Sequence, residues 1–238
     1  MDQPPPGRRV AFFGGSFDPP HLGHLAVARA AREALALDTV LFAPVGAQPL
    51  KPQGSTAGFD DRLAMTRLAI AGQPGLEVSL ADAPKPFGAA NYTLETLLAL
   101  RAELSPGSAL FCLMGADSFI SLRHWHRSAE IPFAAPLIVA SRPNQQLDDL
   151  RAALPAGLTI EPAPRPARTD SEIEVRSYLV HNLAGESAPF YVLPGLQVEI
   201  SASQIRDLIH ADLGTPIAGN ELLPEAVFDY IRSHSLYR

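Results

Sequence analysis

Short apolar runs alternate with longer amphipathic segments along most of the chain. Short apolar runs bounded by turn residues are typical of buried strands, whereas apolar residues at helical spacing over ten or more positions are typical of helices. The pattern therefore predicts strands at 10–13, 40–44, 76–80, 109–114 and 137–140, with a late one near 198–200. It predicts helices at 21–35, 60–71, 93–104, about 147–154, 201–210 and 224–234.

This alternation of strands and helices indicates the fold class. Strand–helix–strand units bring successive strands into a parallel sheet that the helices then cover. We expect an α/β fold, a doubly wound, Rossmann-like parallel sheet with helices on both faces and a C-terminal helical segment. In such open sheets, ligands bind beyond the carboxyl ends of the strands.

Residues 155–194 interrupt the alternation. A proline-rich run at 162–166 is followed by mixed charges through Arg176. We expect a single domain spanning residues 1–238, with an insertion or irregular excursion at about 155–194. A surface loop is the simplest interpretation of that stretch, and its role stays open.

Composition and charge narrow the class of protein. The chain has 238 residues, of which 47% are hydrophobic and 18% charged, which is enough for a sizeable buried core. The net charge of −6 is unfavourable for wrapping a nucleic-acid backbone, so we expect no nucleic-acid partner. No stretch approaches the roughly 20 apolar residues of a membrane span, and the N-terminus lacks the regions of a signal peptide. With the single Cys112 unable to form an internal disulfide, we expect a cytoplasmic protein without a membrane partner.

The strongest candidate for chemistry is the junction between the first strand and the first helix. It reads Gly14-Gly15-Ser16-Phe17-Asp18-Pro19-Pro20-His21-Leu22-Gly23-His24. Backbone N–H groups and the positive end of a helix favour a bound anion at such a junction, and two histidines can donate hydrogen bonds to phosphate oxygens. A metal pair or two ordinary histidines are the alternatives, but a third metal ligand is not evident nearby.

The same run resembles the signature of the nucleotidyltransferase superfamily with the (T/H)xGH motif. Within that superfamily it is most similar to the bacterial nicotinate-mononucleotide adenylyltransferases. Further segments are similar to the same family in the same order, from residue 10 to the C-terminus, with 155–194 unaligned. They are Pro44–Pro52, Asn91–Leu97, Leu113–Phe119, Arg123–Arg127, Ile200–Arg206 and the segment from Leu223 to Tyr237.

The resemblance assigns a substrate side to two of these segments. Relatives contact the nicotinate carboxylate through a backbone N–H at the position of Thr93, and they stack the nicotinate ring on a tryptophan at the position of Trp125. Here Glu95 stands where the family has aspartate. Thr93 is also a natural N-cap, and Trp125 could equally be a half-buried packing residue.

The remaining segments resemble the family's ATP site. The resemblance implies that Lys51 reaches the reacting phosphates and that Gly115 and Asp117 contact the nucleotide. It also implies that Ser201, Ser203 and Arg206 bind phosphate, with Ala202 removing one hydroxyl of the family pattern. Taken alone, Lys51 would more often be a solvated surface lysine. The expected ATP site comprises Gly14, Gly15, Ser16, Phe17, His21, His24, Lys51, Gly115, Asp117, Ser201, Ser203 and Arg206.

The resemblance implies transfer of AMP from ATP to nicotinate mononucleotide, with His21 and His24 as the catalytic residues. The products would be nicotinate adenine dinucleotide and pyrophosphate, in NAD biosynthesis. Mg²⁺ is expected with ATP, without dedicated protein ligands. Alternatives are another acceptor such as nicotinamide mononucleotide, a sister nucleotidyltransferase, and a nucleotide-binding protein without turnover. The oligomeric state, a homo-oligomer included, and the role of Arg62 stay open.

Overall fold

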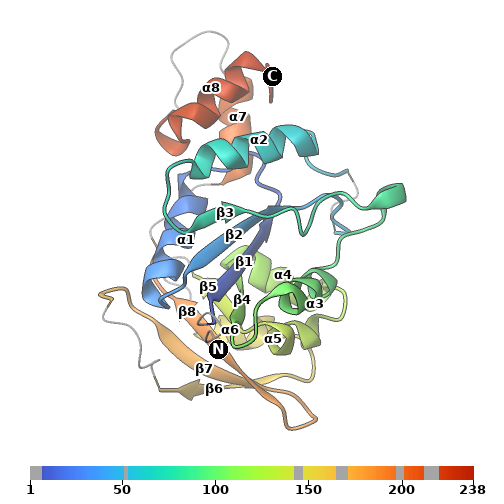
Figure 1. The fold of residues 1–238 in the computed structure, drawn as a ribbon, viewed down its shortest axis with the longest axis vertical. Coiled ribbons are helices and arrows are strands. Elements are labelled where there is room, and N and C mark those ends of the chain that lie inside the picture. The colour runs from blue at the N-terminus through green and yellow to red at the C-terminus, as the bar shows by residue number, and fades with distance from the viewer. Residues whose placement is uncertain (1–6, 51–52, 142–146, 165–170, 197–200, 212–219) are drawn as a thin grey trace, which may run out of the picture.

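A computed structural model describes residues 7–50, 53–141, 147–164, 171–196, 201–211 and 220–238. Its centre is one eight-stranded sheet in the order β3-β2-β1-β4-β5-β8-β7-β6 (Figure 1). The strands are β1 Arg9–Gly15, β2 Thr39–Pro44, β3 Leu76–Val78, β4 Ala109–Gly115, β5 Leu137–Ala140, β6 Thr159–Ala163, β7 Arg176–His181 and β8 Ser187–Leu193. The α-helices are α1 Leu22–Ala34, α2 Phe59–Ile70, α3 Thr93–Glu103, α4 Ala116–Ser121, α5 Ile131–Ala134, α6 Leu147–Ala153, α7 Ala202–Ala211 and α8 Glu225–Ser233.

Helices cover both faces of the sheet, because alternate residues of each strand point to opposite sides. Ala11 and Phe13 of β1 belong to a core shared with α1, α2, α7 and α8. Val10 and Phe12 of the same strand belong to a second core shared with α3, α4, α5 and α6. The predicted doubly wound α/β fold is therefore confirmed.

The first five strands are parallel, and their order reverses between β1 and β4. From β1 the chain builds outward through β2 and β3 on one side, and through β4 and β5 on the other. At such a switch point the loops after the two central strands diverge to opposite faces and leave a crevice at the carboxyl ends. The site therefore lies where β1 ends at Gly15 and β4 ends at Gly115.

Residues 155–194 correct one prediction, because they do not form an irregular loop. They contain β6, β7 and β8, and β8 pairs in parallel with β5 while β7 and β6 add antiparallel. Phe190 of β8 packs against Phe119 of α4, with ring centroids 5.3 Å apart. The excursion thus widens the central sheet instead of leaving it.

Most of the other predicted elements are present within one or two residues of their expected bounds. The sequence pattern missed the short helices α4 and α5. The late strand expected near 198–200 lies outside the described residues. In the part of the chain that is described, no helix is long and apolar enough to span a membrane.

Candidate active site

A cavity of about 850 Å³ opens at the carboxyl ends of β1 and β4. Its walls come from the loops after β1, β2 and β4, from the start of α3 and from the start of α7. Every predicted site residue that the structure describes lines this cavity, whereas Lys51 lies outside the described residues. These lining residues are Gly14, Gly15, Ser16, Phe17, His21, His24, Thr93, Gly115, Asp117, Trp125, Ser201, Ser203 and Arg206.

The two glycines at the end of β1 allow aromatic rings to pack close to the backbone. A Cβ on Gly14 would lie 2.7 Å from the ring of Phe12, and one on Gly15 would lie 3.3 Å from the ring of Phe17. Phe17 itself has a positive φ of 46°, a conformation that costs a residue with a Cβ free energy. A side chain at Gly14 would therefore displace the buried ring of Phe12, whereas one at Gly15 would press against the ring of Phe17.

The histidine pair lies at the junction with α1, and its geometry differs from the prediction in one respect. His21 is the extended N-cap residue of α1, with φ −139° and ψ 171°, so only His24 is inside the helix. The two rings still lie together, with centroids 3.7 Å apart. The backbone N–H of His21 donates to Nδ1 of His24 at 3.2 Å. In the neutral imidazole this leaves the proton on Nε2 of His24, as a donor available to a ligand.

Burial keeps both rings neutral. Desolvation lowers the pKa of His21 from 6.5 to about 4. Desolvation also lowers the pKa of His24 well below its usual value, and repulsion from His21 adds to the effect. The buried Nδ1 of His21 has no hydrogen-bond partner among the described residues. An anion would favour protonation of this pair, because it would supply the missing opposite charge.

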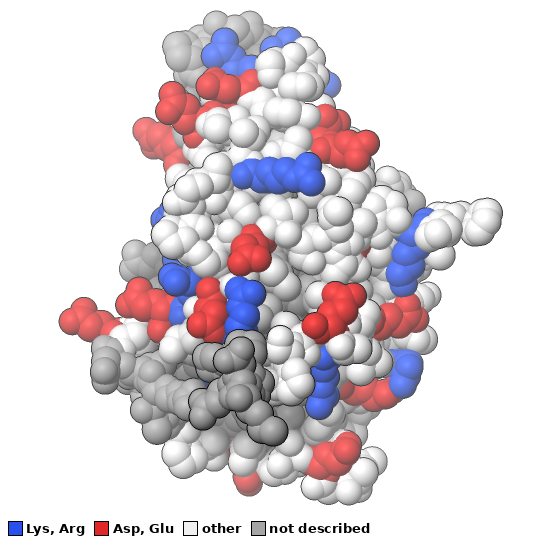
Figure 2. All heavy atoms as spheres, viewed as in Figure 1, with Lys and Arg blue, Asp and Glu red and all other residues white. Residues whose placement is uncertain are grey.

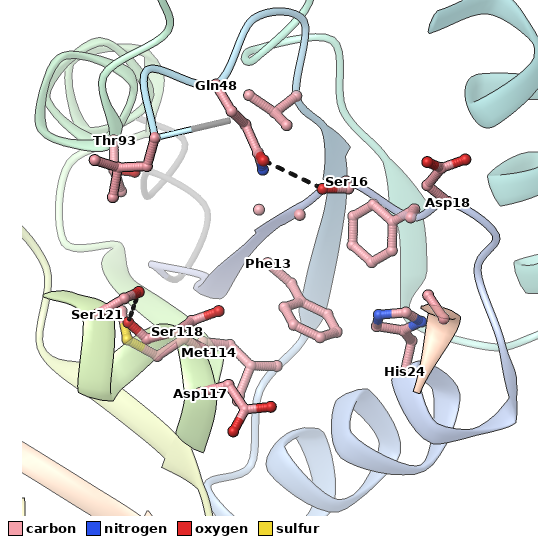
Figure 3. A pocket seen from close by; sticks show the side chains of 18 of the residues that line it. Phe13, Ser16, Asp18, His24, Gln48, Thr93, Met114, Asp117, Ser118 and Ser121 are labelled. Carbon is pink, nitrogen blue, oxygen red and sulfur yellow. Dashed lines mark hydrogen bonds between the residues drawn. The ribbon is translucent and has the colours of Figure 1, made fainter. Parts of the chain in front are cut away.

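The opposite side of the cavity carries the residues predicted for the acceptor. Thr93 lies across the cavity from His24, and Gln48 reaches from the loop after β2 to Ser16 (Figure 3). α3 begins at Thr93, which makes Tyr92 its N-cap and corrects the expectation that Thr93 caps the helix. The backbone N–H of Thr93 lies in the first turn of α3, where such groups lack intrahelical partners.

Trp125 stands beside this helix end. It is half-buried, and its Nε1 donates to Oγ of Ser121 at 3.2 Å, so one edge of the indole is fixed. The next residue, His126, lies against the ring of Tyr92, with centroids 4.4 Å apart. Tyr92 and His126 both line the cavity, and sequence reasoning did not select them.

A buried polar network supports the start of α3. Oγ1 of Thr96 donates to Oδ1 of Asp82 at 2.7 Å. Burial raises the pKa of Asp82, although the hydrogen bond from Thr96 opposes the shift. The Asn91 side chain accepts from the backbone N–H of Ala47 at 3.0 Å and donates to the carbonyl of Ala83 at 3.0 Å. These bonds tie the loop after β2 to the acceptor side of the cavity.

Further lining residues come from the carboxyl end of β4 and from the start of α7. Gly115 is the N-cap of α4, and Asp117 is an exposed acid in its first turn. Ser201 directly precedes α7. Arg206 donates through Nη1 to the carbonyl of Asp18 at 2.7 Å and through Nη2 to Oγ of Ser203 at 3.1 Å. Arg206 therefore joins α7 to the turn that carries the histidines.

Arg62, whose role the sequence left open, lies behind the glycine turn. It is buried, and its guanidinium donates to the carbonyls of Ser16 at 2.7 Å, Val45 at 2.8 Å and Ala57 at 3.2 Å. Burial lowers its pKa, and the nearby Asp18 carboxylate opposes that shift. Arg62 thus connects the loops after β1 and β2 without itself lining the cavity.

Among the described residues, no group of three or more His, Cys, Asp or Glu side chains is arranged to hold a metal ion. The Asp18 carboxylate, the acid next to the histidine motif, already accepts hydrogen bonds from the backbone N–H groups of Thr56 and Ala57. Charges of both signs are interspersed on the face of the molecule shown in Figure 2.

Known proteins with similar sequences indicate the family to which the chain belongs. The sequence profile of the family described as "Cytidylyltransferase-like" matches residues 12–208. Two proteins named "Probable nicotinate-nucleotide adenylyltransferase" are similar over nearly their full lengths. That from Pelobacter propionicus is 35% identical over 229 residues, covering 96% of this chain and 98% of its own. That from Laribacter hongkongensis is 38% identical over 229 residues, covering 96% of this chain and 94% of its own.

Solved structures share the fold at lower identity. A Plasmodium falciparum nicotinic acid mononucleotide adenylyltransferase complexed with NaAD superposes with a TM-score of 0.68 at 14% identity, covering 97% of each chain. The same Plasmodium enzyme complexed with APC gives a TM-score of 0.66 with the same coverage. At this identity the likeness establishes the fold alone.

Proposed function

The chain belongs to the cytidylyltransferase-like family and, within it, to the nicotinate-nucleotide adenylyltransferases, and on that basis we propose that it adenylylates nicotinate mononucleotide. In this reaction a phosphate oxygen of the mononucleotide attacks the α-phosphorus of ATP. The bond from that phosphorus to the bridging oxygen breaks, pyrophosphate leaves, and nicotinate adenine dinucleotide forms. This is a step of NAD biosynthesis.

The observation that carries the proposal is the placement of two sets of groups on opposite sides of one cavity. Donors suited to phosphate, the histidine pair and Arg206, lie on one side. The first turn of α3 and the indole of Trp125 lie on the other, where they suit a carboxylate and a flat ring. A cavity that holds both partners can align the attacking oxygen with the phosphorus.

The chemistry asks little of the protein beyond alignment and charge stabilisation. The attacking phosphate is already ionised at neutral pH, so no general base is needed. We propose that His21 and His24 donate hydrogen bonds to the triphosphate and to the charge that develops at the α-phosphate. Arg206, with Ser201 and Ser203, would hold the departing pyrophosphate, as would Lys51. Gly14, Gly15, Ser16, Phe17, Gly115 and Asp117 would line the rest of the ATP site.

We propose that Thr93 and Trp125 select the acceptor. A backbone N–H donates but does not accept, so it favours a carboxylate oxygen over the NH₂ group of an amide. Nicotinamide mononucleotide remains the alternative acceptor. Mg²⁺ would enter bound to the phosphates of ATP, whose oxygens are the ligands that it prefers.

Substitution of one histidine tests the assignment. His24→Ala should lower pyrophosphate release with ATP and nicotinate mononucleotide by orders of magnitude, because it removes a donor aimed at developing charge. The matched control is His210→Ala, which removes an exposed histidine at the end of α7 outside the cavity lining. Near-normal turnover by His24→Ala, with the control also active, would overturn the role given to the pair.

A further inference from the structure

The C-terminal segment contacts the turn that carries the histidine motif. The hydroxyl of Tyr237, the penultimate residue, donates to Oδ1 of Asp18 at 2.7 Å, across 219 positions of sequence. Both residues are buried, with Tyr237 8% and Asp18 5% exposed. Asp18 lines the cavity and Tyr237 does not, so the hydrogen bond to Asp18 connects Tyr237 to the site.

Asp18 is a junction of four segments. Its carboxylate accepts from the backbone N–H of Thr56 at 2.6 Å and of Ala57 at 3.1 Å, in addition to the Tyr237 hydroxyl. Its backbone carbonyl accepts from the guanidinium of Arg206 at 2.7 Å. The residue therefore connects the glycine turn, the loop before α2, helix α7 and the C-terminus.

The backbone at the C-terminus indicates that the Tyr237 contact is specific. Tyr237 has φ +65°, in the left-handed region that a residue with a Cβ adopts at a cost in free energy. Such a conformation persists where surrounding contacts hold it, and here the neighbouring Leu236 packs against the same core as α8.

Burial and the Asp18 carboxylate keep the hydroxyl of Tyr237 protonated and therefore a donor. Burial raises the pKa of Tyr237, and the carboxylate of Asp18 raises it further, while Arg206 and Arg62 oppose the shift. A protonated hydroxyl facing a carboxylate makes a charge-assisted hydrogen bond, which is among the stronger kinds. Loss of that bond would leave one oxygen of a buried carboxylate with one partner fewer.

We propose that Tyr237 is a positioning residue of the adenylyl transfer, which sets the histidine pair and Arg206 relative to each other by holding Asp18. The inference rests on the proposed function, because it assigns Arg206 and the histidines to the phosphates of ATP. His21 follows Asp18 by three residues, and Arg206 donates a hydrogen bond to the Asp18 carbonyl. Displacement of Asp18 would therefore shift both the histidine pair and the Arg206 guanidinium. The acceptor side at Thr93 is attached to other elements and would stay in place.

The test compares two tyrosines that differ in what their hydroxyl holds. Tyr237→Phe removes the hydroxyl and keeps the ring. Tyr230→Phe is the matched control, because its hydroxyl lies on α8 and donates to Oδ1 of Asp61 on α2, at 3.0 Å and outside the cavity lining. For the full-length proteins, kcat and KM are measured for ATP and for nicotinate mononucleotide, together with unfolding in urea.

For Tyr237→Phe we expect kcat/KM for ATP to fall about tenfold, the scale of one hydrogen bond to a charged group. The KM for nicotinate mononucleotide should change by less than about twofold, since ground-state binding on the acceptor side is untouched. Tyr230→Phe should leave both constants unchanged and should lower the free energy of unfolding less, because its hydrogen bond is only partly buried. In combination with Asp18→Asn, Tyr237→Phe should add no further loss, because the two residues act through one contact.

Three results would overturn the proposal. They are an unchanged kcat/KM for ATP in Tyr237→Phe, an equal loss in Tyr230→Phe, and an equal effect on both substrates, which would indicate general loosening. Calorimetric binding of a non-hydrolysable ATP analogue separates this inference from the proposed function. If the wild-type protein binds the analogue but releases no pyrophosphate, the proposed function fails. Weaker binding of the analogue by Tyr237→Phe than by Tyr230→Phe would still support the positioning role.

Discussion

The buried histidine pair should make the stability of the protein depend on pH in a range where exposed histidines have little effect. His21 has a pKa lowered from 6.5 to about 4 in the folded protein. In the unfolded chain it regains its ordinary value, so between pH 6.5 and about 4 the unfolded state binds more protons. The contribution to stability is therefore fully present above pH 6.5 and is lost as the pH falls toward 4.

The magnitude follows from the size of the shift. One pKa unit corresponds to about 1.4 kcal/mol, so at about pH 5 the protonation of His21 in the unfolded state alone removes about 2 kcal/mol of stability. His24 changes stability in the same direction, because burial lowers its pKa also. A domain with a total stability of about 5–15 kcal/mol should show a loss of this size clearly.

Urea denaturation at about pH 7.5 and pH 5 measures the effect, with His21→Asn as the test variant. Asparagine suits the site, because His21 is the N-cap of α1 and asparagine is a favoured N-cap. We expect the wild-type protein to lose about 2 kcal/mol more than His21→Asn between the two pH values. The control His210→Asn, at an exposed position on α7, should behave as the wild type. Equal losses in wild type and His21→Asn would refute the argument that His21 is buried as a neutral ring.

Two further substitutions test the support of the cavity and its acceptor side. Arg62→Met removes the donors to three backbone carbonyls, so buried acceptors lose their partners. Urea titrations should show a free energy of unfolding lower by about 3 kcal/mol or more. A change within about 0.5 kcal/mol would contradict this prediction. Trp125→Ala should raise the KM for nicotinate mononucleotide about tenfold and change the KM for ATP little, because aromatic stacking contributes about 1 kcal/mol beyond burial. Trp125→Phe should have an intermediate effect. Equal effects on the two KM values would contradict the role given to Trp125.

The sequence predicted β1, β2, β4 and β5 because they are largely buried on both faces and therefore appear as continuous apolar runs. Two of the three strands within 155–194, β6 and β8, have features that hide them from prediction. Prolines occur inside β6 and β8, at Pro162 and Pro189, where a strand is not expected. The exposed and buried residues of β8 also alternate, which is a weaker signal than a continuous apolar run, although Phe190 and Val192 at every second position could have indicated it.

Some residues of the site could be predicted from local sequence runs, whereas contacts between distant segments could not. Glycines, histidines and serines at the ends of predicted strands can be found from the sequence, because each lies at a strand–helix junction of the kind that binds phosphate. Contacts that join distant segments leave no such trace. Arg62 looks like an ordinary polar residue of a helix, yet it is buried and donates to carbonyls of the two loops that follow β1 and β2. The hydrogen bond between Tyr237 and Asp18 joins residues 219 positions apart in the sequence, so it can be found only from the tertiary fold.

The central claim is that one cavity holds ATP at the histidine pair and a nicotinate nucleotide at Thr93 and Trp125. Initial rates of pyrophosphate release, with ATP and either nicotinate or nicotinamide mononucleotide, test it most directly. We expect rapid release with nicotinate mononucleotide and a lower kcat/KM with the amide, because the backbone N–H at Thr93 favours a carboxylate. Release with neither mononucleotide would contradict the adenylyl transfer itself, and preference for the amide would contradict the role given to Thr93.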